Sequence, residues 1–205
     1  MHEVSSQSQL LTVGHSNHPL EAFLDLLRIH GVTAVADVRS MPSSRFNPQY
    51  NRSALADALE RNHIRYVFLG RELGARRDEA ECYVEGKARY ELIAQTPLFR
   101  QGLDRVRRGM KSFRLALLCA EKDPLTCHRT ILICRHLRDA GPISHILDDG
   151  RLEEHTDAEL RLLSLCNLSQ ADLFRSREEL IEEAYDMQSE RIAFVSSSSN
   201  EEVLL

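Results

Sequence analysis

The sequence predicts an α/β protein: a three-layer, Rossmann-like domain with a mostly parallel sheet of about five strands and helices on both faces. Short apolar runs alternate with amphipathic stretches from residue 10 to about residue 147. The runs are mostly bounded by polar residues or glycine, as strands buried in a parallel sheet are. The chain has 205 residues, 42% apolar and 28% charged, which suits one globular domain with an appendage.

Five apolar runs are the predicted strands, at residues 10–13, 32–38, 64–69, 113–118 and 143–147. Four amphipathic stretches between them are the predicted helices. Residues 20–30 gather apolar side chains on one face and end before Gly31, which suits the position after a helix. Ser53, Thr96 and Thr126 are the expected N-caps of the other three, which cover residues 53–62, 97–109 and 127–140.

Two segments break this alternation. The polar stretch 70–90 is expected to be a long connection, a kind of segment that is often functional or mobile. After Asp149 the strand pattern stops, and helical patterns follow at residues 157–167 and 170–191. The predicted organisation is a flexible N-terminus over residues 1–9, an α/β domain over 10–150, a helical extension over 151–192 and a disordered tail over 193–205.

The formal net charge of −5 conceals a basic middle and an acidic end. Residues 39–114 carry 16 basic and 9 acidic side chains, whereas residues 150–205 carry 5 and 13. The middle could meet an anionic partner, or the two parts could face each other. Of the 26 cationic side chains 23 are arginine, which favours bidentate anion recognition but also fits an arginine-biased genome.

Composition excludes several classes of protein. No stretch approaches the roughly 20 uncharged residues that a membrane-spanning helix requires, and the N-terminus lacks both a basic region and a long apolar run. The five cysteines are odd in number and scattered, which argues against a disulfide framework. We therefore expect a cytoplasmic protein without a membrane partner.

Polar or reactive residues follow all five predicted strands, and in an open parallel sheet ligands bind beyond the carboxyl ends of the strands. This density of His, Arg, Cys and carboxylate groups predicts one lined crevice. The five stretches are Gly14-His15-Ser16-Asn17, Asp37-Val38-Arg39 continuing to Ser44-Arg45, Gly70-Arg71-Glu72-Leu73-Gly74, Cys119-Ala120-Glu121 and Asp148-Asp149-Gly150.

The fourth stretch is the richest in chemistry. Cys119 ends its strand, and Cys127 and His128 are expected in the first turn of the next helix. The positive end of that helix would favour an anion and lower the pKa of a thiol. Either cysteine could then be a thiolate nucleophile, with Glu121 or His15 as its base. The competing interpretation is that both cysteines are small buried apolar residues.

A metal site is the other reading of these residues. Cys119, Cys127 and His128, with His15 across the crevice, would supply four zinc ligands of suitable type. The sequence has no C-x-x-C or H-x-x-x-H pair, and adjacent residues of a helix point about 100° apart. We therefore predict no metal and no cofactor. The absence of a G-x-G-x-x-G and of a Walker sequence also disfavours NAD and nucleoside triphosphates.

The remaining candidates each have a structural alternative. His15 is an acid, a base or an orienting donor, unless Ser16 or Asn17 merely caps the following helix. Asp37 and Arg39 point to the same side of a strand end, where they either serve the site or only brace the loop.

The predicted site thus has a catalytic part and an anion-binding part. Arg45, on a loop bounded by prolines, suits a phosphate or carboxylate, whereas Arg76 and Arg77 are expected to be solvated. The catalytic residues are His15, Asp37, Cys119, Glu121, Cys127 and His128, and the anion-binding residues are Ser16, Asn17, Arg39, Ser44, Arg45, Arg71 and Arg129.

Several motifs carry a resemblance to a known family. TVGHSNH, VADVRSMPSSRF, FLGRELGAR and LLCAEKDPLTCHR, followed by HILDDG, resemble the domain of unknown function 488 family over about residues 10–150. The resemblance implies a compact α/β domain of bacterial cytoplasmic proteins and no particular activity. Leu73 stands where such sequences often have a second glycine. The motif residues are Gly14, His15, Ser16, Asn17, Asp37, Arg39, Pro42, Ser44, Arg45, Gly70, Leu73, Gly74, Cys119, Glu121, Cys127, His128 and Arg129.

A more distant likeness is to rhodanese-type sulfurtransferases, which also have Asp-Val-Arg at a strand end and a cysteine ending a later strand. Asp37, Arg39 and Cys119 stand in those places. The rhodanese loop returns an arginine within about six residues, whereas this loop reaches Arg129 only after ten, so the likeness is an analogy.

Three functions compete. The first is an enzyme acting on an anionic substrate such as a nucleotide or modified base, with hydrolytic or glycosidic cleavage favoured over redox chemistry. The second is a nucleic-acid-binding or sensing module without catalysis, because aromatic residues are interleaved with arginine in the basic middle. The third is sulfur transfer or redox chemistry at Cys119 and Cys127. The partner is thus an anionic small molecule or a nucleic acid, and the C-terminal helices could form a homodimer or pack on their own sheet.

Overall fold

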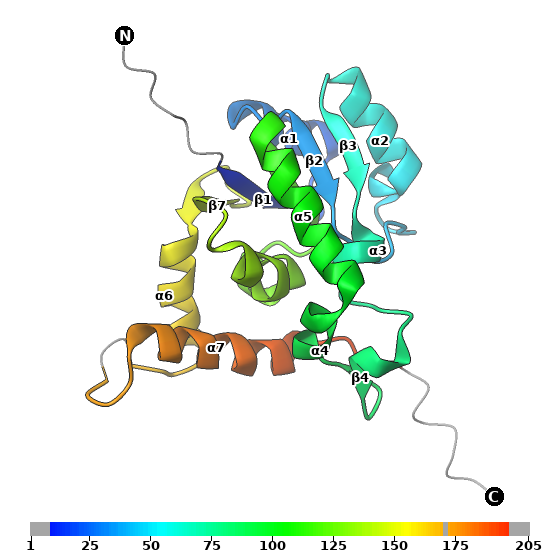
Figure 1. Ribbon diagram of the computed structural model, residues 1–205. Coiled ribbons are helices and arrows are strands. Elements are labelled where there is room, and N and C mark those ends of the chain that lie inside the picture. Colours follow the sequence, from blue (N-terminus) through cyan, green and yellow to red (C-terminus); the bar gives the residue numbers. More distant parts are fainter. Residues whose placement is uncertain (1–8, 170–171, 197–205) are drawn as a thin grey trace, which may run out of the picture.

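The computed structural model describes residues 9–169 and 172–196. Its centre is a six-stranded sheet in the order β3-β2-β6-β1-β7-β8 (Figure 1). Neighbouring strands are parallel except at β8, which pairs antiparallel with β7. The strands are β1 (Leu10–Gly14), β2 (Ala34–Asp37), β3 (Arg65–Phe68), β6 (Leu115–Cys119), β7 (Ile143–Ile146) and β8 (Leu152–Glu154).

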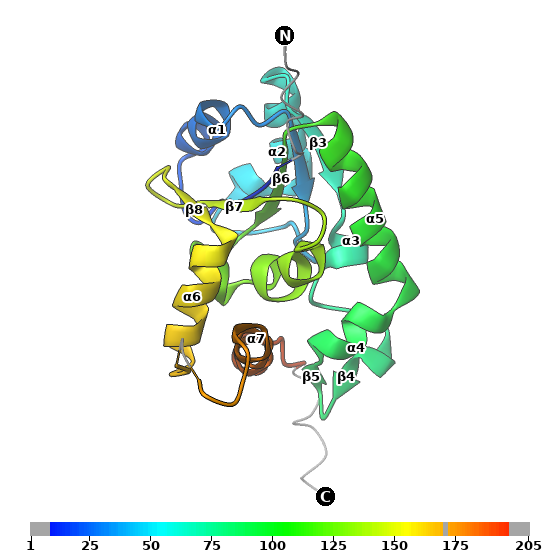
Figure 2. The same cartoon turned by 60° about the vertical axis from the view of Figure 1, so that its left-hand side comes forward.

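Helices cover both faces of the sheet and form the three layers that the sequence predicts. α1 (Leu20–Ile29) and α2 (Arg52–Arg61) pack on one face. α5 (Pro97–Ser112) packs on the other face (Figure 2), and α6 (His155–Leu165) and α7 (Arg177–Ile192) contribute side chains to the same core as α5. In the described part of the chain, no helix combines the length and the apolar character needed to cross a bilayer.

The side chains of each strand alternate between the two cores, because successive residues of a strand point to opposite faces. In β1, Leu11 and Val13 belong to the core under α1 and α2, whereas Leu10 belongs to the other. All five residues of β1 and of β6 are buried, as expected for central strands of a parallel sheet. The apolar runs of the sequence are therefore the strands themselves.

Two of the predicted helix ends are confirmed, and one differs by a residue or two. The Thr96 side chain accepts a hydrogen bond from the backbone N–H of Phe99 and caps α5. Gly31, with φ +62°, follows the end of α1. Asn51 rather than Ser53 occupies the N-cap position of α2, after a 3-10 turn at Pro48–Tyr50, and its side chain makes no capping hydrogen bond.

The predicted connection 70–90 contains short elements instead of one irregular loop. α3 (Gly70–Leu73) follows β3, and a 3-10 turn at Ala80–Cys82 leads into a hairpin. The hairpin strands are β4 (Tyr83–Val84) and β5 (Lys87–Ala88), and α4 (Tyr90–Gln95) comes next.

The helix predicted for residues 127–140 is wrong in type and in starting point. A 3-10 turn at Pro124–Thr126 is capped by Asp123, so Thr126 is not the cap. Cys127 is extended, with φ −131° and ψ 139°. A π-helical turn at Arg129–Ile133 and a 3-10 turn at Cys134–Leu137 then follow. This irregular course decides the geometry of the site.

The C-terminal extension belongs to the same fold. β8 adds a sixth, antiparallel strand to the five predicted ones and lies beyond the predicted domain end at residue 150. Leu180, Ile181, Ala184 and Tyr185 of α7 are buried in the larger core. Most of the apolar face that the sequence offered for a homodimer is therefore covered within the chain, whereas Leu173 is exposed.

The chain continues past α7 with a segment that contacts the β4–β5 hairpin. The N–H of Ala88 donates to the carbonyl of Phe194 at 2.8 Å, and the N–H of Ser196 donates to the carbonyl of Gly86 at 2.7 Å. The start of the predicted disordered tail, residues 193–196, is thus paired. The rest of that tail and residues 1–8 of the predicted flexible N-terminus lie outside the described residues.

Candidate functional site

The central strands β1, β2 and β6 end side by side at one edge of the sheet. His15, Arg39 and Cys119 lie at or just after these ends. The backbone N–H of His15 donates to the carbonyl of Cys119, and that of Ser16 to the carbonyl of Ala120, both at 2.9 Å. The predicted crevice therefore lies at the carboxyl ends of the three strands, where open α/β sheets bind ligands.

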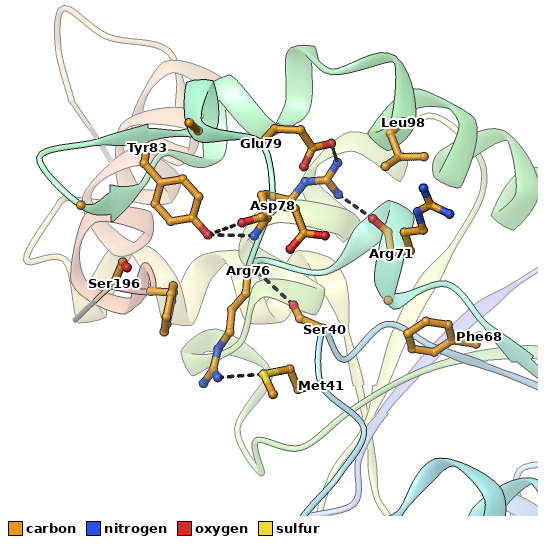
Figure 3. Close-up of a pocket in the computed structure, with 15 residues that line it drawn as sticks. Ser40, Met41, Phe68, Arg71, Arg76, Asp78, Glu79, Tyr83, Leu98 and Ser196 are labelled. Carbon is orange, nitrogen blue, oxygen red and sulfur yellow. Dashed lines mark hydrogen bonds and ion pairs between the residues drawn. The ribbon is translucent and has the colours of Figure 1, made fainter. Parts of the chain in front are cut away.

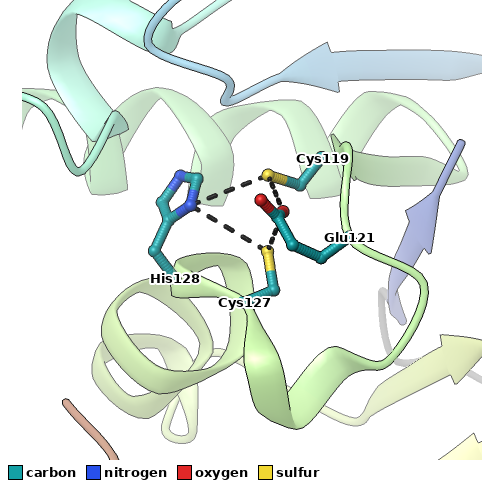
Figure 4. A group of neighbouring side chains, drawn as sticks. All are labelled: Cys119, Glu121, Cys127 and His128. Carbon is teal, nitrogen blue, oxygen red and sulfur yellow. Dashed lines mark hydrogen bonds between the residues drawn. The ribbon is translucent and has the colours of Figure 1, made fainter. Parts of the chain in front are cut away.

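Four side chains converge beyond the end of β6: Cys119, Glu121, Cys127 and His128 (Figure 4). The thiols of Cys119 and Cys127 donate to the same oxygen, Oε2 of Glu121, at 2.9 and 3.0 Å. Nδ1 of His128 lies 3.6 Å from Sγ of Cys119 and 3.9 Å from Sγ of Cys127. The two cysteines are buried, His128 is 9% exposed, and Glu121 is exposed.

Two arginines hold the loop that carries this cluster. Arg129 donates from Nη1 to the carbonyl of Glu121 at 2.6 Å and from Nη2 to that of Lys122 at 3.1 Å. Arg161 of α6 donates to both carboxylate oxygens of Asp123, at 2.9 and 3.0 Å. These bonds hold the loop at Glu121, Lys122 and Asp123, so the positions of the four cluster side chains do not depend on a regular helix.

The carbonyl of Val38, just after β2, orients the imidazole of His128. Nε2 lies 3.0 Å from this oxygen. A carbonyl can only accept, so Nε2 carries a proton and Nδ1 is the nitrogen that faces the two sulfurs. Histidines that bind metals are oriented in the same way by a partner of the second ring nitrogen.

The cluster moves the pKa values of its members in opposite directions. Burial raises the pKa of the Cys119 thiol well above its ordinary value. Burial acts in the same way on Cys127, but its interactions with Cys119, Arg129 and His128 outweigh it and bring the pKa to about 6. For Glu121 the two thiol hydrogen bonds outweigh burial and bring the pKa to about 2. The cluster therefore contains a carboxylate and a thiol that ionises near neutral pH.

Asp37 and Arg39 form a buried ion pair at the end of β2, with side chains 0% and 7% exposed. Arg39 donates from Nε to Oδ1 at 2.9 Å and from Nη2 to Oδ2 at 2.6 Å. Nη1 donates to Nε2 of His15 at 3.1 Å. A guanidinium has five N–H groups, so two of them have no protein partner among the described residues.

The contacts of His15 are those of an orienting group. Its Nδ1 lies 2.8 Å from the carbonyl of Ser16, so Nδ1 is protonated and Nε2 accepts from Arg39. The ring stacks on Tyr50 with 4.1 Å between centroids. Burial and the charge of Arg39 lower the pKa of His15 to about 4, so the imidazole is neutral at pH 7. His15 therefore holds Arg39 in place.

Two adjoining cavities open on these groups. One, of about 390 Å³, is lined by Cys119, Glu121, His128 and Arg39. The other, of about 330 Å³, is lined by His15 and Arg39. Because Arg39 lines both cavities, a ligand in either one can reach the guanidinium.

A larger cavity of about 930 Å³ lies beside the first and shares Ser40, Met41 and Arg76 with it (Figure 3). Arg71 lines this cavity and neither of the two smaller ones. Arg77, expected to be solvated, is 6% exposed and donates to the carbonyl of Arg71. The stretch after the third predicted strand, which contains Arg71, thus lines this larger cavity and does not reach the cluster.

Of the other predicted anion-binding residues, some line a small cavity and some do not. Ser16, Asn17 and Ser44 line the cavity beside His15. Arg45 is exposed and lines neither small cavity. Arg129 is fully buried and is occupied in holding the loop. The structure therefore leaves Arg45 and Arg129 out of the crevice.

Sequence reasoning missed several residues that line the crevice. Tyr90, Ile192 and Phe194 line the cavity beside Cys119, and Arg76, expected to be solvated, lies over the Phe194 ring at 4.5 Å from its centroid. Ile192 and Phe194 come from the C-terminal end of the described chain. No local pattern connects them to a strand exit more than 70 residues earlier, so only tertiary packing reveals them.

The geometric argument against a metal does not hold in the structure. It assumed that Cys127 and His128 are successive residues of a helix. Because Cys127 is extended, both side chains turn to the same centre, and their atoms lie 3.9 Å apart. Among the residues described, Cys119, Glu121, Cys127 and His128 form the one group that could hold a metal ion, and His15 is not part of it.

The fold and the crevice define a layered α/β protein with a polar site at the carboxyl ends of its central strands. The family model described as Domain of unknown function DUF488 matches residues 19–135, more than half of the chain, and the chain belongs to this family. No curated protein and no solved structure shows a significant match to the chain. These comparisons do not show the likeness to rhodanese-type sulfurtransferases.

Proposed function

We propose that this protein is an enzyme that cleaves an anionic small molecule by hydrolysis in the crevice at the ends of β1, β2 and β6. The observation that carries the proposal is the buried guanidinium of Arg39, which lines two cavities and keeps two N–H groups without a protein partner. A cation fixed in this way is pre-organised for an anion and loses little freedom on binding.

The surroundings of Arg39 favour a nucleotide, including one with a modified base, as the substrate class. The guanidinium would bind a phosphate, because its planar fork matches phosphate oxygens. Phe194, which is half-buried in the same cavity, offers aromatic surface for a base. Ser16 and Ser44 line the adjoining cavity with hydroxyl groups that can complete the contacts to an anion.

We assign to Glu121 the role of orienting the attacking water. Its carboxylate is exposed in the cavity that Arg39 lines, and its pKa of about 2 keeps it ionised at neutral pH. An ionised carboxylate accepts a hydrogen bond from water and orients it for attack. In this proposal Arg39 binds the anion and Glu121 orients the nucleophilic water.

The test uses the full chain with a panel of nucleoside monophosphates, product release by chromatography, and calorimetry with inorganic phosphate. Arg39→Lys keeps the positive charge beside Asp37 but loses the planar fork, so we expect phosphate affinity to fall about tenfold or more. Glu121→Gln should bind phosphate normally and lower turnover about 100-fold. Arg45→Ala is the matched control, because Arg45 lines neither small cavity.

Circular dichroism and thermal unfolding verify that each variant is folded. Equal phosphate binding by the wild type and Arg39→Lys would contradict the assignment of Arg39. Undiminished turnover in Glu121→Gln would remove Glu121 from the reaction, and turnover of no substrate in the panel would remove the substrate class.

A further inference from the structure

The imidazole and the two thiols beyond β6 lie at distances close to those of a tetrahedral metal site. A zinc ion about 2.3 Å from sulfur and about 2.0–2.1 Å from nitrogen holds these two ligands about 3.6 Å apart. Nδ1 of His128 lies 3.6 and 3.9 Å from the sulfurs of Cys119 and Cys127. With an oxygen of Glu121, all four atoms lie within 4.8 Å of one another. The two nitrogen–sulfur distances already lie close to those of a tetrahedral site, whereas the sulfur–oxygen distances of 2.9 and 3.0 Å must lengthen when the thiols lose their protons to a metal.

The contacts around the cluster are also those of a metal site. Nε2 of His128 is held by the carbonyl of Val38 at 3.0 Å, which leaves Nδ1 as the coordinating nitrogen. The backbone N–H of Arg129 points at Sγ of Cys127 at 3.4 Å, a donor suited to a thiolate. His128 and Cys127 are therefore each oriented by a bond from outside the cluster.

Charge and ligand chemistry select the ion. Two thiolates and one carboxylate bring three negative charges, and a divalent ion offsets two of them. The guanidinium of Arg129, which donates to the carbonyl of Glu121, adds a positive charge in the same loop. Two sulfur ligands and an imidazole favour zinc and exclude magnesium and calcium, which prefer oxygen.

We propose that Cys119, Cys127, His128 and Glu121 bind one zinc ion. The first three ligands are buried or nearly so, whereas Glu121 is exposed in the crevice. Glu121 is therefore the exchangeable ligand: its replacement by water would place a zinc-bound water in the cavity that Arg39 lines and free the Glu121 carboxylate to orient that water. Zinc lowers the pKa of such a water to about 7. This catalytic role rests on the proposed function, whereas the zinc site itself does not.

The direct test is metal binding by the full chain, freed of metal by a chelator under reducing conditions. Zinc titration against a chromogenic chelator should give one tightly bound equivalent. Cobalt in place of zinc should produce a thiolate-to-metal charge-transfer band and the intense visible bands of a tetrahedral ion.

Ligand variants locate the ion. Cys127→Ser and His128→Gln should weaken zinc binding by at least about tenfold and should abolish or alter the cobalt spectrum. Cys166→Ser is the matched control, because Cys166 is buried but its sulfur donates to the carbonyl of Ala184, which a hydroxyl can also do. Its zinc binding should equal that of the wild type.

Three results would overturn the zinc site: a wild-type protein that binds less than one equivalent, a cobalt spectrum without a thiolate band, or Cys127→Ser binding zinc like the wild type. The wild-type measurements stand even if a variant fails to fold. Arg39→Lys separates the two proposals, because it should keep the zinc and lose the anion. If the protein binds zinc but Arg39→Lys binds phosphate like the wild type, the proposed function alone is contradicted. If Arg39→Lys loses phosphate binding but the wild type binds no zinc, the zinc site alone is contradicted.

Discussion

At the scale of single residues, the crevice depends on the carboxylate of Asp37. This fully buried group accepts hydrogen bonds from the Arg39 side chain, from the backbone N–H of Arg39 at 3.1 Å and from the hydroxyl of Tyr66 at 2.8 Å. It therefore compensates the buried guanidinium and orients it. A buried ion pair adds little net stability, but removal of one partner leaves the other charge without compensation.

We predict that Asp37→Asn lowers the free energy of unfolding by about 3–5 kcal/mol, because the positive charge of Arg39 stays buried without its counterion. Urea denaturation followed by circular dichroism measures the change. The exposed pair Asp149–Arg151 is the control, and Asp149→Asn should unfold like the wild type. Equal unfolding of Asp37→Asn and the wild type would show that the pair is not needed for stability.

Gly14, the last residue of β1, makes close contact with the loop that carries the cluster. A Cβ at this position would lie 1.9 Å from the carbonyl oxygen of Glu121 and 3.3 Å from Nη1 of Arg129. Both neighbours belong to the framework that holds Glu121, so they cannot move without moving the site.

We therefore predict that Gly14→Ala lowers the free energy of unfolding by about 1–3 kcal/mol and weakens zinc binding, because the loop after β6 must shift. Gly109→Ala in α5 is the control, since the added Cβ would meet a leucine methyl group at 3.1 Å and alanine favours the helix. Urea denaturation and zinc titration measure the two effects. A Gly14→Ala protein with wild-type stability would contradict the contact.

At the scale of elements, a chain of buried histidines joins β1 and β7 to α6 and α7. Nδ1 of His145 accepts from Thr12 at 2.8 Å, and Nε2 of His145 lies 3.0 Å from Nδ1 of His155. Nε2 of His155 lies 3.0 Å from the hydroxyl of Tyr185, which donates to Glu159. With one proton on each imidazole, at Nε2, every hydrogen bond of this series has one donor and one acceptor. Both histidines are therefore neutral.

This chain predicts loss of stability in mild acid. Burial lowers the pKa of His155 from 6.5 to about 4, and that of His145 also falls well below its ordinary value. Between about pH 6.5 and 4 the unfolded chain binds protons that the folded protein does not, so stability falls as the pH falls. From His155 alone we expect a loss of about 2 kcal/mol between pH 7.5 and pH 5.

Urea denaturation at the two pH values measures this loss, and His155→Gln should make the dependence shallower. Carboxylates with lowered pKa values, such as Glu121, titrate below this range and contribute little to it. Stability that is constant from pH 7.5 to pH 5 would contradict the buried neutral histidines.

At the scale of the whole molecule, the C-terminal helices complete the crevice. Gln188 of α7 donates to the carbonyl of Leu125 at 2.8 Å, and Phe194 lines the cavity beside Cys119. In Figure 2, α7 lies below the turns that follow β6. The extension is thus both part of the core and part of the wall of the site.

We predict that removal of residues 170–205 prevents cooperative folding. Burial of a large apolar side chain contributes roughly 1.5–3 kcal/mol, and α7 buries Leu180, Ile181 and Tyr185. Their sum approaches the whole stability of a typical domain, about 5–15 kcal/mol. Thermal unfolding and the binding of a hydrophobic dye test this expectation.

The control for the truncation is the double variant Leu173→Ser/Phe174→Ser, at two side chains that are each 94% exposed. This variant should unfold like the wild type. A truncated protein with the same cooperative transition as the full chain would show that residues 10–150 form an independent domain after all.

Elements with a strong periodic pattern follow from the sequence. The five parallel strands and the core-facing sides of α1 and α5 follow from the burial of apolar residues at fixed spacing. The turns after β6 do not, because Asp123 caps an earlier turn and Arg129 is drawn back to the loop carbonyls. β8 is missed because its residues are exposed or half-buried and lack an apolar run.

The sequence by itself determined the layered α/β fold and which strand ends carry the reactive groups, because both depend on local hydrophobic periodicity and on the rule that parallel strands end at one edge. Only the tertiary structure decided which of these groups meet. The extended conformation of Cys127 unites two cysteines, His128 and Glu121, whereas burial removes Arg129 from the crevice and exposure leaves Arg45 outside it. These outcomes depend on contacts between residues far apart in the chain, which no local pattern encodes.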